Sequence, residues 1–187
     1  MDSRTIHKIC TDVNILKDKF LGVVRLRDLL TARENNETCL RLAKTGQFFI
    51  VNVENVHWIA FLWIDPNRMF VFDSLGLTDN KTMKQTISFV FGVQNVKFLH
   101  AKNNYHIQSS DSLTCGEHVV YFCLYQTLFD KVNKHFDEEY IKNLKQFCNN
   151  SNISTDLFVW LEIYDRMKLA QVPDLHEIIN WERQQVQ

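Results

Sequence analysis

Residues 47–75, QFFIVNVENVHWIAFLWIDPNRMFVFDSL, decide the fold. They contain three runs rich in Val, Ile, Phe and Trp, at 47–53, 57–64 and 68–75, a composition typical of β-strands. The residues DPN at 65–67 are a turn signal between the last two runs. We therefore expect three successive strands, the last two joined in an antiparallel hairpin.

The segments on either side of these strands predict mostly helices. Apolar residues between 5 and 20 recur on one stripe, at Ile6, Ile9, Cys10, Val13, Leu16 and Phe20, as in an amphipathic helix. Similar reasoning predicts helices over 25–34, 78–92, 137–148, 154–170 and 174–185, and a fourth strand over 95–102 that 105–108 extends.

Residues 115–129, CGEHVVYFCLYQTLF, are apolar on nearly all sides of a helix. Such a helix belongs in the centre of a protein, and Ser112 or Thr114 is placed to cap its start. The elements together predict an α+β fold. We expect a small, mostly antiparallel sheet around this buried central helix, with flanking helices outside.

The composition is that of one soluble globular domain spanning 1–187. Hydrophobic residues make up 45% and charged residues 23% of the 187 residues. Lys and Arg number 21 against 22 Asp and Glu, so the charge balance does not call for nucleic acid or an anionic membrane as partner. The apolar runs are too short to span a bilayer, and we expect no membrane partner.

The cysteines argue against a disulfide framework and against a metal site. Their number is odd and no C-x-x-C pair occurs, at Cys10, Cys39, Cys115, Cys123 and Cys148. This usage fits a reducing compartment. The polar start MDSRTIHKIC predicts no signal peptide, so we expect a protein that is not secreted.

Cys115 is the candidate nucleophile. It follows a polar, turn-prone segment, QSSDSLT at 108–114, and opens the apolar helix. A thiol in the first helical turn lies near the positive end of the helix dipole, which favours the thiolate. Cysteine is also often a plain buried apolar residue. The adjacent Gly116, which leaves room for a substrate backbone, favours the nucleophile.

A cysteine nucleophile needs a base, and His57 is the strongest candidate among seven histidines. It begins an expected strand, which holds it rigidly, and Trp58 follows to shield it. His118 lies one helical turn after Cys115, beside the backbone, and we interpret it as structural or solvated. The other histidines are less well placed: His7 and His135 in polar contexts, and His100 and His106 near a strand end.

Two further residues complete the candidate site. Asp73 ends the strand after His57, and an antiparallel hairpin brings the start of one strand beside the end of the next. Asp73 could thus orient the imidazole, although a lone Asp before SLG is also a common turn residue. Gln108 could turn its amide toward the Cys115 backbone N–H and share a developing negative charge.

The ordered set VHWIAFLWI, FVFDSLG and Q-x6-CG resembles the cysteine proteases of the adenain type. It is similar, more broadly, to the superfamily that includes the SUMO and ubiquitin-like-protein proteases. The resemblance covers roughly 47–129, with FLGVV at 20–24 matching a stretch near the adenain N-terminus. TCGEHVVYFCLYQ is similar to versions from adenovirus-like viruses and Polinton/Maverick transposons.

The resemblance implies a catalytic triad of Cys115, His57 and Asp73, with Gln108 in the oxyanion hole and Trp58 and Gly116 supporting the cleft. It further implies an endopeptidase that cleaves viral capsid or core precursors after small residues such as Gly-Gly. A monomer located in the virion and the host nucleus or cytoplasm is expected on the same ground.

The same resemblance implies an activating peptide and DNA as cofactors. Adenovirus proteases bind that peptide through a Cys upstream of the Gln, whereas this sequence has no Cys between Gly76 and Gln108. DNA binding there uses a basic surface, and here only Lys97, Lys102 and the 131–134 region could form one. The sequence itself therefore requires no cofactor.

Three other functions fit parts of the sequence. A deubiquitinase or SUMO protease would use the same residues on host conjugates, and DSLG at 73–76 fits that branch. An acetyltransferase would pass the thioester to an amine. A binding module without catalysis would use the cleft alone, a reading that the full set of four residues opposes.

Overall fold

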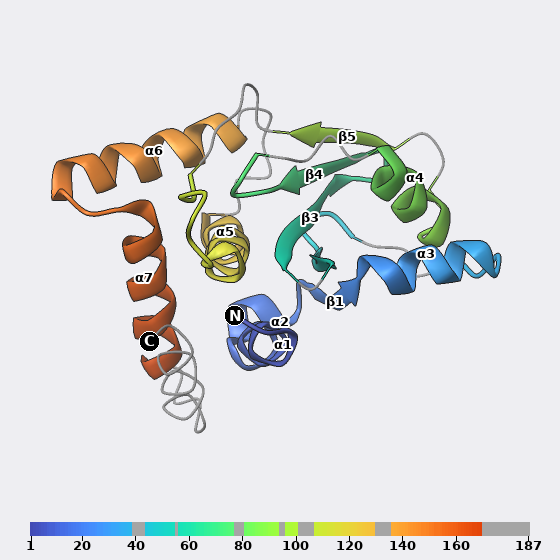
Figure 1. Ribbon diagram of the computed structural model, residues 1–187, viewed down its shortest axis with the longest axis horizontal. Helices are drawn as coiled ribbons and strands as arrows, with labels where there is room; N and C mark the ends of the chain where they lie inside the picture. Colours follow the sequence, from blue (N-terminus) through green and yellow to red (C-terminus); the bar gives the residue numbers. More distant parts are fainter. Residues whose placement is uncertain are drawn as a thin grey trace.

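The computed structural model describes residues 1–38, 44–54, 56–76, 81–93, 96–100, 107–129 and 136–169 (Figure 1). Its helices are α1 Ser3–Asp12, α2 Asn14–Lys17, α3 Leu26–Glu34, α4 Lys81–Val90, α5 Cys115–Phe129, α6 Phe136–Ser151 and α7 Thr155–Leu169. Its strands are β1 Phe20–Arg25, β2 Phe48–Val53, β3 His57–Asp65, β4 Arg68–Phe72 and β5 Lys97–His100.

The five strands form one sheet in the order β1-β2-β3-β4-β5, and the fold is α+β as predicted. The expectation of a mostly antiparallel sheet is wrong. β3 runs antiparallel to both of its neighbours, β2 and β4. At the two edges, however, β1 pairs parallel with β2, and β5 pairs parallel with β4. The sheet is mixed because a helix, α3 or α4, connects the strands of each parallel pair, and such a crossover returns the chain in the same direction.

Both faces of the sheet are buried, which explains why its strands lack polar alternation. On one face, Phe48, Ile50 and Ala60 join the core around α5. On the other, Phe49 and Val51 join a second core with α3 and α4. A sheet covered on both faces has near-continuous apolar strands, as the sequence of residues 47–75 shows.

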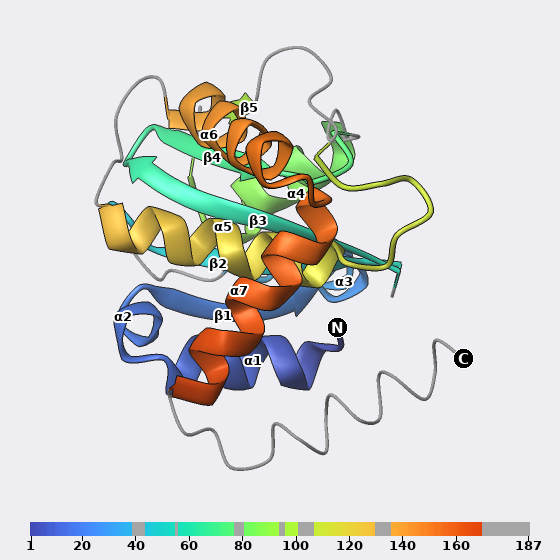
Figure 2. The same ribbon diagram turned by 90° about the vertical axis from the view of Figure 1, so that its left-hand side faces the viewer.

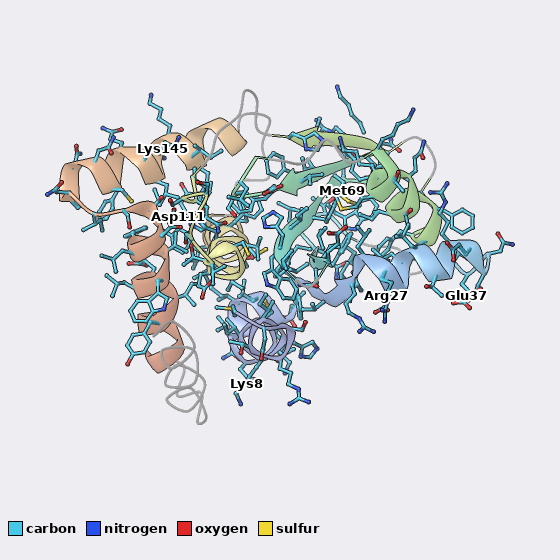
Figure 3. All side chains as sticks on the ribbon, viewed as in Figure 1. Lys8, Arg27, Glu37, Met69, Asp111 and Lys145 are labelled. Atoms are coloured by element: carbon cyan, nitrogen blue, oxygen red, sulfur yellow. The ribbon has the colours of Figure 1, made fainter. Side chains whose placement is uncertain are left out.

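The topology determines which helices cover which face. β1, β2, β4 and β5 all point the same way, because two antiparallel pairings separate β2 from β4. Right-handed crossovers that step across the sheet in one direction place their helices on the same face. α3 and α4 accordingly lie together on one side, where Met69 belongs to the core that they cover, and α5 takes the other side (Figures 1 and 3).

The central helix α5 is the helix predicted at 115–129. It lies between the sheet and the outer helices, with α7 crossing in front of it (Figure 2). Phe122, fully buried, stacks on Phe72 with ring centroids 4.2 Å apart, and Tyr140 of α6 meets it edge-on. This packing on both sides explains the apolar character of α5 and fixes the position of its first residue, Cys115.

The N-terminal helix differs from the prediction. The stripe over 5–20 is divided, because Val13 has an extended backbone (ψ 105°) that ends α1 and precedes the short α2. Phe20 belongs to β1 rather than to a helix. The helices predicted at 25–34, 137–148 and 154–170 correspond to α3, α6 and α7.

Some other predicted helices and strands have different bounds in the structure, and some lie outside the described residues. Gly92 (φ 63°) lies just after α4. Of the predicted strand at 95–102, β5 contains Lys97–His100 and leaves out residue 96, while residues 95, 101 and 102 lie outside the described residues. Residues 107 and 108 are not in a strand. The predicted helix at 174–185 and residues 105 and 106 lie outside the described residues.

Candidate active site

His57 and Asp73 form a hydrogen-bonded pair at one end of the β3–β4 hairpin. His57 is the first residue of β3 and Asp73 follows the last residue of β4. His57 Nε2 lies 2.8 Å from Asp73 Oδ1. The Asp73 side chain is 1% exposed, and its Oδ1 also accepts the Leu75 N–H at 2.9 Å. The carboxylate is thus held in place, so that it orients the imidazole.

Cys115 lies beside this pair. It begins α5, is buried, and its Sγ lies 3.9 Å from the carbonyl oxygen of Val56, the residue before His57. Because Asp73 engages Nε2 of His57, Nδ1 is the nitrogen left for the sulfur. The three residues predicted for catalysis are therefore brought together from β3, the end of β4 and the start of α5.

The charge state of His57 follows from these neighbours. Burial acts to lower the pKa of the imidazole, but hydrogen bonds to Asp73 and Cys115, and the negative charges of both, outweigh it. The pKa of His57 is raised from 6.5 to about 9. At neutral pH the ring is an imidazolium that can stabilise a thiolate next to it.

Gln108 lies at the start of the loop that leads to Cys115. Its Oε1 lies 2.5 Å from Ser74 Oγ, and its Nε2 donates to the Ser112 carbonyl at 2.7 Å. The sequence led us to expect the amide to turn toward the Cys115 backbone, whereas one of its hydrogens bonds to Ser112. A primary amide carries two N–H donors, and this bond uses one of them.

Trp58 and Gly116 pack against the N-terminal residue. Trp58 Nε1 donates to the Met1 carbonyl at 3.0 Å. A Cβ on Gly116 would lie 2.7 Å from the Met1 Cβ and 3.4 Å from Trp58 Cδ1. The expectation that Gly116 leaves room for a substrate backbone is wrong, because Met1 occupies that space. Glycine is needed here for close packing inside the protein.

A second histidine–carboxylate pair, with the histidine buried and the carboxylate partly exposed, braces the same loop. His118 is 0% exposed and its Nε2 lies 2.8 Å from Asp156 Oδ1, at the start of α7. The same carboxylate accepts from Thr114 Oγ1 at 2.5 Å and from the Ser109 N–H at 3.1 Å. His118 is structural, as interpreted from the sequence, and Asp156 ties both ends of the loop 109–114 to α5 and α7.

We expect the Asp156→Asn variant to be less stable at neutral pH by about 2 kcal/mol. Both carboxylate oxygens accept hydrogen bonds, so an amide would turn an N–H toward a donor. His118, Thr114 and Ser109 hold the pKa of Asp156 at about 2, against burial, which acts to raise it from 3.8. Because the folded-state pKa is lowered, this stabilisation is present above pH 4 and is lost toward pH 2.

Urea unfolding at pH 7 and at pH 2.5 would measure this contribution. The difference between the wild type and Asp156→Asn should be large at pH 7 and small at pH 2.5. Glu34→Gln, at an exposed position of α3 far from this loop in the chain, is the matched acid-to-amide control. Equal stabilities of the wild type and Asp156→Asn at pH 7 would contradict the role of Asp156 as a brace.

Two residues that hold the site together, Asp156 and Ser74, could not be recognised from the sequence. Asp156 resembles an ordinary acidic residue in the first turn of a helix, and only the packing of α7 on α5 reveals its partners. Ser74 stood in the DSLG motif without a role. Of the other histidines, His7 packs against the Phe20 ring and His100 lies on β5, while His106 and His135 lie outside the described residues.

The described part of the chain offers no metal site and no membrane span. No three His, Cys, Asp or Glu side chains of these residues gather closely enough to hold an ion. No helix among them has the length and apolar character needed to cross a bilayer.

Comparisons with known proteins assign no family. No family model and no curated protein matches the sequence. One solved structure with a similar backbone is the central domain of the uncharacterized protein Lpg1148 from Legionella pneumophila. The alignment has a TM-score of 0.48 and 10% identity, and covers 90% of this chain and 98% of the other.

Proposed function

We propose that this protein is a cysteine endopeptidase of the adenain-like kind. Cys115 is the nucleophile, His57 the general base and acid, and Asp73 the residue that orients His57. The observation that carries the proposal is the hydrogen-bonded His57–Asp73 pair beside the Cys115 sulfur, which raises the pKa of His57 to about 9. A nucleophile next to an oriented base is the arrangement that covalent catalysis requires.

The reaction follows from these contacts. The Cys115 thiolate attacks a peptide carbonyl carbon, and the carbonyl oxygen becomes an oxyanion. His57, as imidazolium, gives its proton to the leaving amine, the C–N bond breaks, and an acyl-enzyme remains. Neutral His57 then takes a proton from water, whose oxygen attacks the thioester and releases the acid and the thiolate.

The oxyanion would be stabilised at the start of α5. The first backbone N–H groups of a helix have no partner within it, and the Cys115 N–H is one of these. The second N–H of Gln108 Nε2 would supply the other donor. Each such donor typically contributes about 10²-fold to the rate.

Two apolar side chains beside the nucleophile support a polypeptide substrate. Val56 is 75% exposed and Leu113 is 79% exposed, more than any other large hydrophobic residue in the described part of the chain. Val56 precedes His57, and Leu113 lies two residues before Cys115. Surface groups of this kind at a reaction centre favour contact with apolar side chains of a bound chain. We propose viral precursor proteins as substrates, with ubiquitin-like conjugates as the alternative.

Covalent labelling would test this function. A short peptide electrophile ending in Gly-Gly, and ubiquitin and SUMO carrying the same warhead, would be reacted with the protein and mapped by mass spectrometry. We expect fast labelling of Cys115 by the short peptide, because the oriented imidazolium stabilises its thiolate. Cys123, on the same helix but 1% exposed, is the internal control and should stay unlabelled.

The pattern of labelling separates the alternatives. Reaction with the full-length proteins alone would move the assignment to a deconjugating enzyme. Labelling of Cys115 no faster than a free cysteine, with every probe and with DNA or candidate activating peptides added, would contradict catalysis and favour a binding module.

A further inference from the structure

The residue after Asp73 contacts the other half of the candidate site. Ser74 is 0% exposed, and its Oγ lies 2.5 Å from Oε1 of Gln108, 34 positions later in the chain. Gln108 is itself only 5% exposed. We propose that Ser74 is a positioning residue, which turns the Gln108 amide so that its second N–H, the one not donated to Ser112, faces the reacting carbonyl oxygen. This inference rests on the proposed function.

The orientation of the amide follows from its partners. The Ser112 carbonyl, 2.7 Å from one end of the amide, can only accept a hydrogen bond, so that end carries the NH₂ group. The other end is therefore the oxygen, and the Ser74 hydroxyl must be the donor to it. A flipped amide would place its oxygen against the Ser112 oxygen and lose that hydrogen bond, while its NH₂ group would donate to the Ser74 hydroxyl instead.

The backbone of Ser74 also contacts Gln108. The Ser74 carbonyl accepts from the N–H of Ile107 at 3.1 Å and from the N–H of Gln108 at 3.2 Å. Asp73, the preceding residue, orients His57. Two consecutive residues therefore position two parts of the candidate site. Asp73 orients the base, His57, and Ser74 orients the oxyanion donor, Gln108.

Removal of the Ser74 hydroxyl would leave Gln108 Oε1 buried without a donor. A buried acceptor that loses its partner is unfavourable, and the amide would escape by rotating or flipping. Either movement takes the free N–H away from the oxyanion. Gln108 is still present in such a variant, so the loss should be smaller than that of a missing oxyanion donor, which costs about 10²-fold or more in kcat.

The test is a double-mutant cycle with Ser74→Ala and Gln108→Ala, measured as kcat and KM on a cleavable peptide. We expect Ser74→Ala to lower kcat about tenfold with little change in KM, and Gln108→Ala to lower it about 10²-fold. The double variant should equal Gln108→Ala, because Ser74 acts only through Gln108. The same tenfold loss in both backgrounds would overturn the proposal.

Two controls show that Ser74 acts on the amide and not on the base. Ser110→Ala, an exposed serine in the same loop, should leave kcat unchanged. In Ser74→Ala, the alkaline pH at which kcat/KM falls should stay where it is in the wild type, because the His57–Asp73 pair is intact. A shift of that pH would show an effect through Asp73 and would overturn the proposal.

A measurement that needs no substrate keeps this inference separate from the proposed function. NMR of the Gln108 side-chain amide in the wild type should show one proton protected from exchange, the proton donated to Ser112. Ser74→Ala should reduce that protection at least tenfold, and unchanged protection would overturn the inference. If the wild type cleaves no peptide, the proposed function fails, while the NMR result still decides whether Ser74 orients the amide.

Discussion

Replacing Cys115 with alanine should abolish peptide cleavage, with a loss of kcat on the order of 10⁶-fold. In the proposed mechanism the sulfur is the atom that forms the acyl-enzyme, and no other side chain of the candidate site can take its place. Cys115 is 5% exposed at the first turn of α5, and loss of one sulfur atom leaves only a small cavity. We therefore expect the free energy of unfolding to change by about 1 kcal/mol or less.

Activity and folding of this variant would be measured together, by peptide cleavage and urea unfolding. Cys115→Ser is the matched variant: it keeps the shape but offers a hydroxyl that is not ionised beside an imidazolium. It should also lose nearly all activity. Near-wild-type cleavage by Cys115→Ala, with the fold intact, would refute the proposed mechanism.

Replacing Asp73 with alanine should lower kcat/KM at least 10²-fold. The carboxylate holds Nε2 of His57 at 2.8 Å and supplies part of the negative charge that raises the pKa of the ring. Without it, the imidazole is free to rotate away from the sulfur. The Asp73→Asn variant separates the two effects, since its amide oxygen can still accept from His57 and Leu75 while the charge is gone.

The pH dependence of the wild type and of these variants follows from the raised pKa of His57. The imidazolium is lost as the pH rises through about 9, so kcat/KM of the wild type should fall there. In Asp73→Asn this fall should move to lower pH, because one source of the raised pKa has been removed. Because the pKa of His57 is higher in the folded state, the His57–Asp73 pair stabilises the folded state fully below pH 6.5. This contribution disappears as the pH rises through about 9. An unchanged alkaline limb in Asp73→Asn would contradict the assigned role.

The elements that the sequence predicted well are those whose local pattern agrees with their packing. β2, β3 and β4 are buried on both faces, so nearly every residue is apolar and the runs at 47–53, 57–64 and 68–75 are easy to recognise. α5 is surrounded by the sheet and by other helices, and its sequence is mostly apolar. In both cases burial on all sides leaves a strong signal.

The direction of the strands could not be predicted in the same way. β1 has six residues, only partly buried, and contains Gly22 with φ 138°, so it lacks a strand pattern. Its parallel pairing with β2 depends on the crossover through α3. Such a pairing joins segments that are far apart in the chain, and the composition of neither segment reveals it.

In the candidate site, too, some residues were predictable from the sequence and others were not. His57, Asp73, Gln108 and Cys115 were predicted because each belongs to a chemical role that has few suitable residue types. Ser74, Asp156 and the packing of Met1 on Gly116 were not, since they hold the site by contacts between distant segments. Residue types thus indicate which side chains could react, but the contacts that hold those side chains in place are known only from the structure.

The two cores of the sheet close at different times during synthesis of the chain. Among the described residues, the core with α3 and α4 contains none beyond Phe98, whereas the core around α5 also includes Val159 and Ile163 of α7. A ribosome makes the chain from its N-terminus, and Asp156, which braces the loop before the nucleophile, emerges more than 40 residues after Cys115. The growing polypeptide thus carries its thiol without the brace, and the candidate site is complete only once α7 has been made.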